Sequence, residues 1–153
     1  MATPGFNQQE DVVHDLMVHD LDWLLSALNR PPEGIRILQA DRVGRTLSRV
    51  SCELLFSDGP VIRVTASKIE KTRRRELILH GAGGEKTCID LNCTPFKAGN
   101  DPLTLQAHAF LDLLRGNASS IATGMEILPV MALGERIREA CPTAEDSYAE
   151  EAR

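Results

Sequence analysis

The sequence is poor in aromatic residues and has no long apolar run. Aromatic side chains make up 4% of its 153 residues, so a core must be built mainly from aliphatic side chains. No stretch approaches the roughly 20 apolar residues that cross a bilayer. Residues 1–10 also lack the basic and then apolar pattern of a signal peptide. We therefore expect a cytoplasmic protein without a membrane partner.

Basic residues are outnumbered by acidic ones. The chain has 17 Lys and Arg against 22 Asp and Glu, a net charge of −5 at pH 7. A protein that binds the phosphate backbone of nucleic acid needs a basic surface, so we expect no nucleic-acid partner. The run Arg73-Arg74-Arg75 lies between predicted strands and is interpreted as a solvated turn.

The four cysteines form no C-x-x-C pair, and no Cys/His cluster has the spacing of a zinc ribbon. We therefore predict reduced, structural thiols and no metal site. Two of the cysteines fall in strand-like apolar stretches, where a free Cys behaves as a small hydrophobic residue. These two are Cys52 and Cys88, and the others are Cys93 and Cys141.

Hydrophobic periodicity predicts a helix, then strands, then two helices, which is the order of an α+β fold. The first helix covers residues 11–28, and Asn29 with the prolines at 31 and 32 ends it. About five strands joined by short turns should pair largely antiparallel. Their predicted ranges are 35–43, 46–57, 61–67, 76–81 and 86–91.

The pattern of residues in the last third of the sequence predicts two helices. Asp101-Pro102 is a helix start and Gly116 a stop. The second helix runs from about Thr123, where Thr123 and Glu126 fit a capping box, to about residue 140. Because Pro129 falls inside it, this helix either starts later or kinks. We predict one domain over residues 11–140, a flexible lead-in over 1–10 and an acidic tail over 141–153.

Asp15 and His19 stand four residues apart in the first predicted helix, so both side chains share one face. Asp22 and Ser26 extend this polar stripe. A carboxylate beside an imidazole suits general acid–base chemistry, because it orients the ring and stabilises the imidazolium. The same spacing is common on exposed helices, where it gives only a weak charge interaction. Spacing alone leaves both interpretations open.

The segment DVVHDLMVHDLDWLLSALNRPP, residues 11–32, resembles the first helix of the C-terminal domain of the Gfo/Idh/MocA oxidoreductases. In that family this helix opens with an Asp, three residues and then His-Asp. The hairpin at Phe56-Ser57-Asp58-Gly59 and the helix from Pro102 to Gly116 follow in the family's order. The resemblance covers roughly residues 11–140 and is closest to the nucleotide-sugar dehydrogenases.

The resemblance implies an open, mostly antiparallel sheet with helices on one face and a second subunit on the other. It implies that His19 is the general acid/base facing a sugar hydroxyl, that Asp15 assists, and that hydride moves to or from NAD(P). The family's Rossmann domain and its Glu-Lys-Pro motif do not occur in these 153 residues, and Gly81–Gly84 is only a turn. We therefore expect no cofactor-binding residues and no activity from this chain alone.

Three hypotheses remain. The chain is the substrate-binding and dimerisation domain of a split or truncated NAD(P)-dependent sugar, possibly nucleotide-sugar, dehydrogenase with a Rossmann-domain partner chain. Alternatively, it is a non-catalytic, self-associating binding module, or a small independent enzyme that uses Asp15 and His19. In strand 61–67, apolar or small residues occur on both faces, which predicts a homodimer through the sheet.

Overall fold

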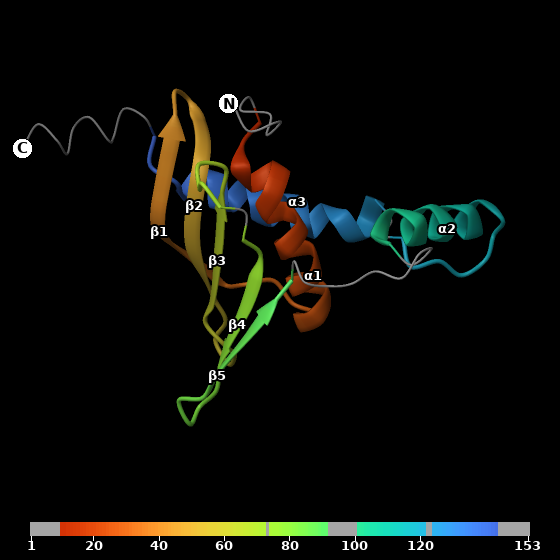
Figure 1. Cartoon of the computed structure of the whole chain (residues 1–153), viewed down its shortest axis with the longest axis horizontal. Coiled ribbons are helices and arrows are strands. Elements are labelled where there is room, and N and C mark those ends of the chain that lie inside the picture. The colour runs from red at the N-terminus through yellow and green to blue at the C-terminus, as the bar shows by residue number, and fades with distance from the viewer. Residues whose placement is uncertain (1–9, 73, 92–100, 122–123, 144–153) are drawn as a thin grey trace, which may run out of the picture. The chain divides into compact units, whose positions relative to one another are not determined.

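The structure is a computed structural model that describes residues 10–72, 74–91, 101–121 and 124–143 (Figure 1). Its contacts divide the chain into two units. The helix–sheet unit combines Met1–Glu70 with Thr123–Arg153, and the hairpin–helix unit is Lys71–Ala122. The prediction of a single domain over residues 11–140 stays a prediction.

The first predicted helix is confirmed, but its opening turns differ from an ordinary α-helix. A π-helical segment, η1 (Val13–Met17), leads into α1 (Val18–Leu28). The carboxylate of Asp11 accepts a hydrogen bond of 2.9 Å from the N–H of Val13, which satisfies one of the first free amides. Asn29 ends the helix in the left-handed conformation, with φ +50° and its N–H bonded to the carbonyl of Leu25.

Three long strands follow and pair antiparallel in the order β1-β2-β3. They are β1 (Gly34–Val43), β2 (Thr46–Leu55) and β3 (Ile62–Ser67). The central row of the register joins Ile37 to Cys52 and Cys52 to Val64. The α+β class with open antiparallel sheets is confirmed, although hydrogen bonding divides the five strands into two sheets.

One face of β1-β2-β3 forms the core with the helices. Because side chains alternate along a strand, Val50, Cys52 and Leu54 of β2 share this face with Val64 and Ala66 of β3. The helical side of the core comes from η1, α1 and α3 (Gly124–Ala140). Its buried members are Val12, Val13, Met17, Leu21, Leu24, Val130, Leu133 and Ile137.

Helix α3 runs through Pro129 without a break, so the predicted later start does not occur. Proline has no backbone N–H, and Pro129 is the sixth residue of the helix. Its position therefore lacks the hydrogen bond that an N–H would donate to a carbonyl in the preceding turn. The predicted end is confirmed, because the helix stops at Ala140 and Cys141 donates its N–H to the carbonyl of Arg138 at 3.1 Å.

The hairpin–helix unit contains an antiparallel pair, β4 (Glu76–His80) and β5 (Lys86–Asp90), and the helix α2 (Pro102–Leu114). Asp101 caps α2 as predicted, since its Oδ1 accepts the N–H of Thr104 at 3.0 Å. Gly116, with φ +76°, follows the helix end. Of the α2 side chains that the structure describes, none is buried.

The predictions for the cysteines are confirmed for some of them and wrong for one. Cys52 and Cys141 are free and buried, and burial raises the pKa of the Cys52 thiol to about 12, with a smaller effect from Cys141. The interpretation of Cys88 as a packed apolar residue is wrong, because β5 is exposed along its whole length. Cys93, Arg73, Thr123, the lead-in before Glu10 and the tail after Thr143 lie outside the described residues.

Candidate functional site

The two predicted site residues lie on the same helical segment but in different environments. Asp15 belongs to the π-helical turn η1, and its side chain is 30% exposed. His19 lies one turn later on α1 and is exposed. The structure records no hydrogen bond or ion pair between these two described residues. The i→i+5 hydrogen bonds of η1 widen this turn of the helix. The four-residue spacing of Asp15 and His19 therefore no longer places their side chains about 40° apart around the helix axis, as it would in an α-helix.

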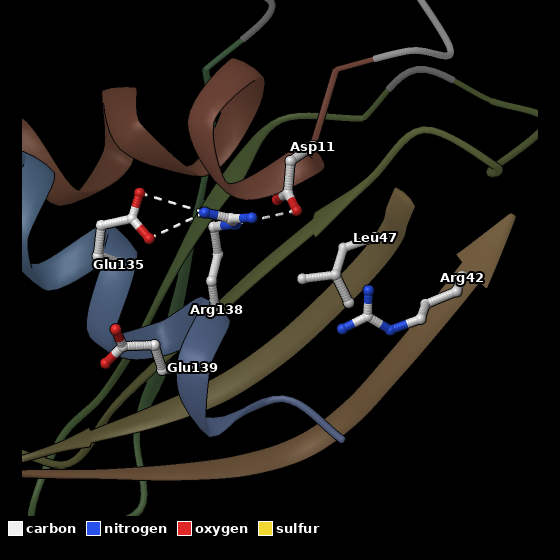
Figure 2. A pocket seen from close by; sticks show the side chains of 6 residues that line it. All are labelled: Asp11, Arg42, Leu47, Glu135, Arg138 and Glu139. Atoms are coloured by element: carbon white, nitrogen blue, oxygen red, sulfur yellow. Dashed lines mark hydrogen bonds and ion pairs between the residues drawn. The ribbon is translucent and has the colours of Figure 1, made fainter. Parts of the chain in front are cut away.

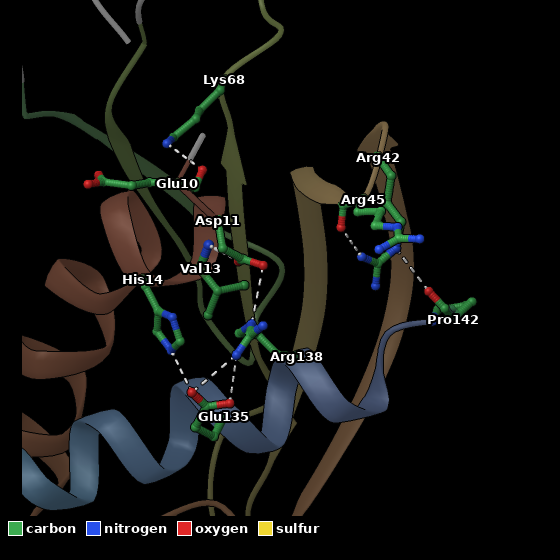
Figure 3. Close-up of polar contacts among 10 residues, drawn as sticks. All are labelled: Glu10, Asp11, Val13, His14, Arg42, Arg45, Lys68, Glu135, Arg138 and Pro142. Carbon is green, nitrogen blue, oxygen red and sulfur yellow. Dashed lines mark hydrogen bonds and ion pairs between the residues drawn. The ribbon is translucent and has the colours of Figure 1, made fainter. Parts of the chain in front are cut away.

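The carboxylate of Asp15 is bound by a lysine instead. Its Oδ2 lies 2.6 Å from the Nζ of Lys68, which follows the end of β3. The side chain of Lys68 is only 5% exposed, and its Nζ also donates to the backbone carbonyl of Glu10 at 2.8 Å (Figure 3). The ammonium of Lys68 thus ties the start of the first helix to the sheet.

Sequence reasoning missed Lys68, although a signal for it existed. Residues two apart in a strand share a face, so the series Ile62, Val64 and Ala66 continues to Lys68 on the side that the helices cover. A lysine that extends the buried row of a strand needs a partner, because an unpaired buried ammonium is unfavourable. A carboxylate on the covering helix supplies it.

A depression of about 200 Å³ lies where the start of η1, the β1-β2 sheet and α3 approach one another (Figure 2). Arg138 Nε lies 3.2 Å from Asp11 Oδ2, and its Nη1 lies 2.8 Å from Glu135 Oε2. Burial opposes the charge of Arg138, but these two carboxylates raise its pKa overall. The depression is lined by Asp11, Arg42, Leu47, Glu135, Arg138 and Glu139.

The two arginines of this lining, Arg42 and Arg138, already have partners within the protein. Arg42 donates to the carbonyls of Arg45 and Pro142, at 2.9 and 3.2 Å (Figure 3). The Nε2 of His14 lies 3.3 Å from Glu135 Oε1, but this buried atom makes no hydrogen bond. The contact becomes an ion pair only when His14 is protonated. These contacts join the start of the first helix to α3, and β1 to the segment that follows α3, and both arginines of the lining are engaged in them.

The sheet face opposite the helices is polar. Glu53 of β2 lies between Arg36 of β1 and Arg63 of β3, with its Oε1 2.8 Å from Arg63 Nη2. Hydrogen bonds from Arg63 and Arg36 lower the pKa of Glu53, against an opposing effect of burial. Beside this row, the hydroxyls of Ser51 and Thr65 lie 2.8 Å apart. Arg63 and Thr65 of β3, which alternate with its core-facing residues, belong to this polar face, and the predicted homodimer through the sheet stays a prediction.

The glycine-rich segment that the sequence offers does not form a phosphate-binding loop. The glycine cluster, Gly81–Gly84, joins the antiparallel strands β4 and β5, whereas a phosphate-binding loop joins a strand to a helix. Two of its amides are already used, since Gly81 donates to the carbonyl of Glu85 and Gly84 to that of Gly81. No described group of three or more His, Cys, Asp or Glu side chains could hold a metal ion. None of the described helices is long and apolar enough to cross a membrane.

Known proteins resemble this chain in fold. No protein-family model and no curated protein sequence matches it. The UDP-N-acetylglucosamine 3-dehydrogenase GnnA from Acidithiobacillus ferrooxidans matches in one crystal form with a TM-score of 0.70 at 19% identity, over 90% of this chain and 49% of GnnA. In a second form the TM-score is 0.67 at 20% identity, over 85% and 47% of the two chains. The chain has the fold of an oxidoreductase domain.

A probable oxidoreductase, yhhX, also matches, with a TM-score of 0.53 at 14% identity, over 94% of this chain and 52% of that one. The chain thus spans about half the length of the solved structures that it matches. The resemblance to one domain of the Gfo/Idh/MocA oxidoreductases is confirmed for the fold. The roles of Asp15 and His19 stay predictions.

Proposed function

We propose that this chain is the substrate-binding and dimerisation domain of an NAD(P)-dependent sugar dehydrogenase whose cofactor domain lies outside these 153 residues, on a further domain or on a partner chain. The observation that carries the proposal is the fold similarity, which extends over 90% of this chain and 49% of a UDP-N-acetylglucosamine 3-dehydrogenase. A nucleotide sugar is therefore the first substrate class to test. The glycine-rich turn at residues 81–84 joins two antiparallel strands and does not lead from a strand into a helix, as a phosphate-binding loop does. This supports a cofactor site elsewhere.

In this proposal His19 exchanges a proton with a substrate hydroxyl. Its exposure on α1 leaves the imidazole accessible to a ligand. Asp15 assists by holding negative charge on the preceding turn, where Lys68 fixes the carboxylate 2.6 Å from its Nζ. A second subunit covers the polar sheet face, where the row Arg36-Glu53-Arg63 would form the centre of a charged interface.

The structure also contains an observation that favours a non-catalytic binding module. The carboxylate of Asp15 is bound by Lys68, and no contact joins Asp15 to His19 among the described residues. A general acid/base is normally oriented by a hydrogen-bonded partner. If His19 lacks that partner when ligand is bound, the fold remains while the chemistry is lost.

A ligand titration followed by NMR separates the two functions. We expect millimolar UDP-N-acetylglucosamine to shift the ring resonance of His19, and His19→Ala to weaken binding about tenfold, which corresponds to roughly 1.4 kcal/mol. The control is His108→Ala, because His108 is an exposed histidine in the hairpin–helix unit. It should leave the affinity unchanged.

The competing outcomes are distinct. Binding that is unaffected by His19→Ala removes His19 from the site and favours the non-catalytic module. A lack of any response to nucleotide sugars contradicts the proposed substrate class. Tight binding of NADH by these 153 residues alone, measured by its fluorescence, would contradict the assignment of the cofactor site to a region outside them.

A further inference from the structure

The polar sheet face, opposite the helices, carries its charges in rows that cross the strands β1, β2 and β3. Glu53 of β2 lies opposite Arg36 of β1 and Arg63 of β3, and both arginines bind its carboxylate. One carboxylate thus lies between two guanidinium groups, which leaves one positive charge in excess. We call these three residues the positive row. The two arginine side chains are each 64% exposed, whereas the side chain of Glu53 is 8% exposed.

The pattern of charge is reversed four residues earlier on β2. Arg49 binds Asp41 of β1, with 3.2 Å between Nη1 and Oδ2, and it also binds Glu70, which follows the end of β3. One guanidinium group here lies between two carboxylates, which leaves one negative charge in excess. We call these three residues the negative row. Both carboxylates reach solvent, since the side chain of Asp41 is 37% exposed and that of Glu70 is 57% exposed.

A neutral row separates the two charged rows. Ser51 of β2 pairs in register with Gln39 of β1 and Thr65 of β3, and its hydroxyl lies 2.8 Å from that of Thr65. Because a strand rises about 3.3 Å per residue, the charged rows lie roughly 7 Å from the neutral row, on opposite sides of it. The excess charge of the polar sheet face therefore changes from positive through neutral to negative along the strands.

We propose that the polar sheet face binds the same face of a second copy of this chain, about a twofold axis that crosses the strands at the neutral row. The inference rests on the proposed function, in that it takes this face as the dimerisation surface, and it adds the orientation of the two copies. Such an axis places the positive row of each copy over the negative row of the other. The facing pairs are Arg36 with the partner's Asp41, Glu53 with the partner's Arg49, and Arg63 with the partner's Glu70.

The charges disfavour the other way of stacking the two faces. When the strands of two stacked sheets are aligned, a twofold axis between the sheets lies either along the strands or across them. An axis along β2 would keep each row over its own copy and exchange β1 with β3. Arg36 would then lie over the partner's Arg63, and the two Glu53 carboxylates would face each other. Such contacts between like charges are unfavourable, so the charge pattern selects the axis across the strands.

The twist of the sheets is compatible with this arrangement. Stacked sheets lie about 10 Å apart and keep their strands within about 30° of one another. Each charged row is only two residues from the axis, so the twist displaces it little from the row that it faces. Because the removal of water from charged groups offsets much of their attraction, these pairs determine orientation more than affinity. We therefore expect the dissociation constant of the dimer to rise with salt.

A charge exchange tests the facing pairs. Arg36→Glu and Asp41→Arg are introduced into separate whole chains, which are sedimented alone and as an equal mixture. Each variant alone places like charges at both copies of this pair, and its dissociation constant should be at least about tenfold above that of the wild type. The mixture restores opposite charges at both copies and should return close to the wild-type value.

A second exchange, Arg63→Glu mixed with Glu70→Arg, repeats the test at β3. Circular dichroism identifies any variant that fails to fold, and the other exchange then decides. The matched control is Arg136→Glu, which makes the same change of charge on α3, the helix that packs on the other face of the sheet. It should leave the dissociation constant unchanged.

Two results would overturn the orientation. Arg36→Glu would gain an ion pair with the partner's Arg63 about the axis along the strands, so a variant that dimerises more tightly than the wild type contradicts the axis across them. A mixture that dimerises as weakly as its separate variants contradicts the facing pairs.

The wild-type chain separates this inference from the proposed function. It should dimerise at about 100 μM in low salt, and an increase from about 0.05 M to about 0.5 M salt should raise the dissociation constant at least about tenfold. A monomer at about 100 μM in low salt overturns the inference and the proposed dimerisation together. A dimer that is insensitive to salt and to both exchanges overturns the inference alone. The response of His19 to nucleotide sugars is measured independently of these outcomes.

Discussion

The two units of the chain bury their side chains to very different extents. In the helix–sheet unit, both helical segments and the central strand contribute fully buried residues, among them Met17, Val50 and Ile137. In the hairpin–helix unit, all five residues of β5 are exposed, as are most described residues of α2. Both units have regular secondary structure, but among the described residues only those of the helix–sheet unit form a core of this kind.

The difference shows that hydrogen-bonded elements and a hydrophobic core are separate contributions to stability. Local opening is easiest where few apolar side chains are buried, so the hairpin–helix unit should open at lower free energy than the helix–sheet unit. An isolated two-stranded hairpin and a short helix are marginal in water.

The largest expected change in the free energy of unfolding is for a substitution in the core of the helix–sheet unit. Leu21→Ala removes a fully buried side chain from between the helices and the sheet, and we expect a loss of about 2–5 kcal/mol in the free energy of unfolding. Urea denaturation followed by circular dichroism measures this loss.

The matched control is Leu79→Ala in β4, where the same side chain is about half exposed. Its cost should stay below about 1 kcal/mol, because most of the removed surface already contacts water. If the two substitutions cost the same, the contrast between the units is wrong.

An intermediate effect is expected at the ion pair of Lys68 and Asp15. Lys68→Met keeps the length of the side chain but leaves the carboxylate and the carbonyl of Glu10 without this donor. Since Asp15 is partly exposed, we expect a cost of about 1–3 kcal/mol and not the larger penalty of a fully buried charge.

A double-mutant cycle with Asp15→Asn isolates the pair. The double variant should be less destabilised than the sum of the single variants, by about 1 kcal/mol. Strict additivity would show that the contact at 2.6 Å contributes nothing measurable to holding the first helix on the sheet.

The smallest effect is expected at the start of α2. Hydrogen bonds from Thr104 lower the pKa of Asp101, so the cap stabilises the helix above the carboxyl's unfolded pKa and is lost as the pH falls through the lowered folded value. Amide resonances of the first turn should report this loss below about pH 4.

Asp101→Ala should weaken the first turn of α2 at every pH, whereas Asp101→Asn should retain the cap without the titration. The helix–sheet unit serves as the internal reference, because its core resonances should not respond to either substitution. A core that responds equally would mean that the units unfold together.

Local patterns predicted most of the elements. The alternation in β2, the Asp101-Pro102 helix start and the end of α1 at Asn29 depend on near neighbours, and each was confirmed. Pro129 gave an ambiguous signal, and tertiary packing decided it. Val130 and Leu133, directly after the proline, are buried in the core, which holds the helix continuous through the missing hydrogen bond.

The candidate site was only partly predictable. The sequence placed Asp15 and His19 on one helix, but it did not reveal that Asp15 belongs to a π-helical turn or that Lys68 binds its carboxylate. Lys68 lies 53 positions after Asp15 in the sequence. A contact over such a distance depends on how the helix packs on the sheet, which short-range periodicity does not specify.

The sequence by itself determined the order of helices and strands, the aliphatic character of the core and the resemblance of the first helix to an oxidoreductase domain. These properties follow from the overall composition and from the spacing of side chains within a few residues of one another. Only the tertiary structure decided which carboxylates meet which cations, that one face of the long sheet is ion-paired, and that no described side chain of α2 is buried. Each of these depends on burial and on contacts between distant segments, and those exist only once the chain has folded.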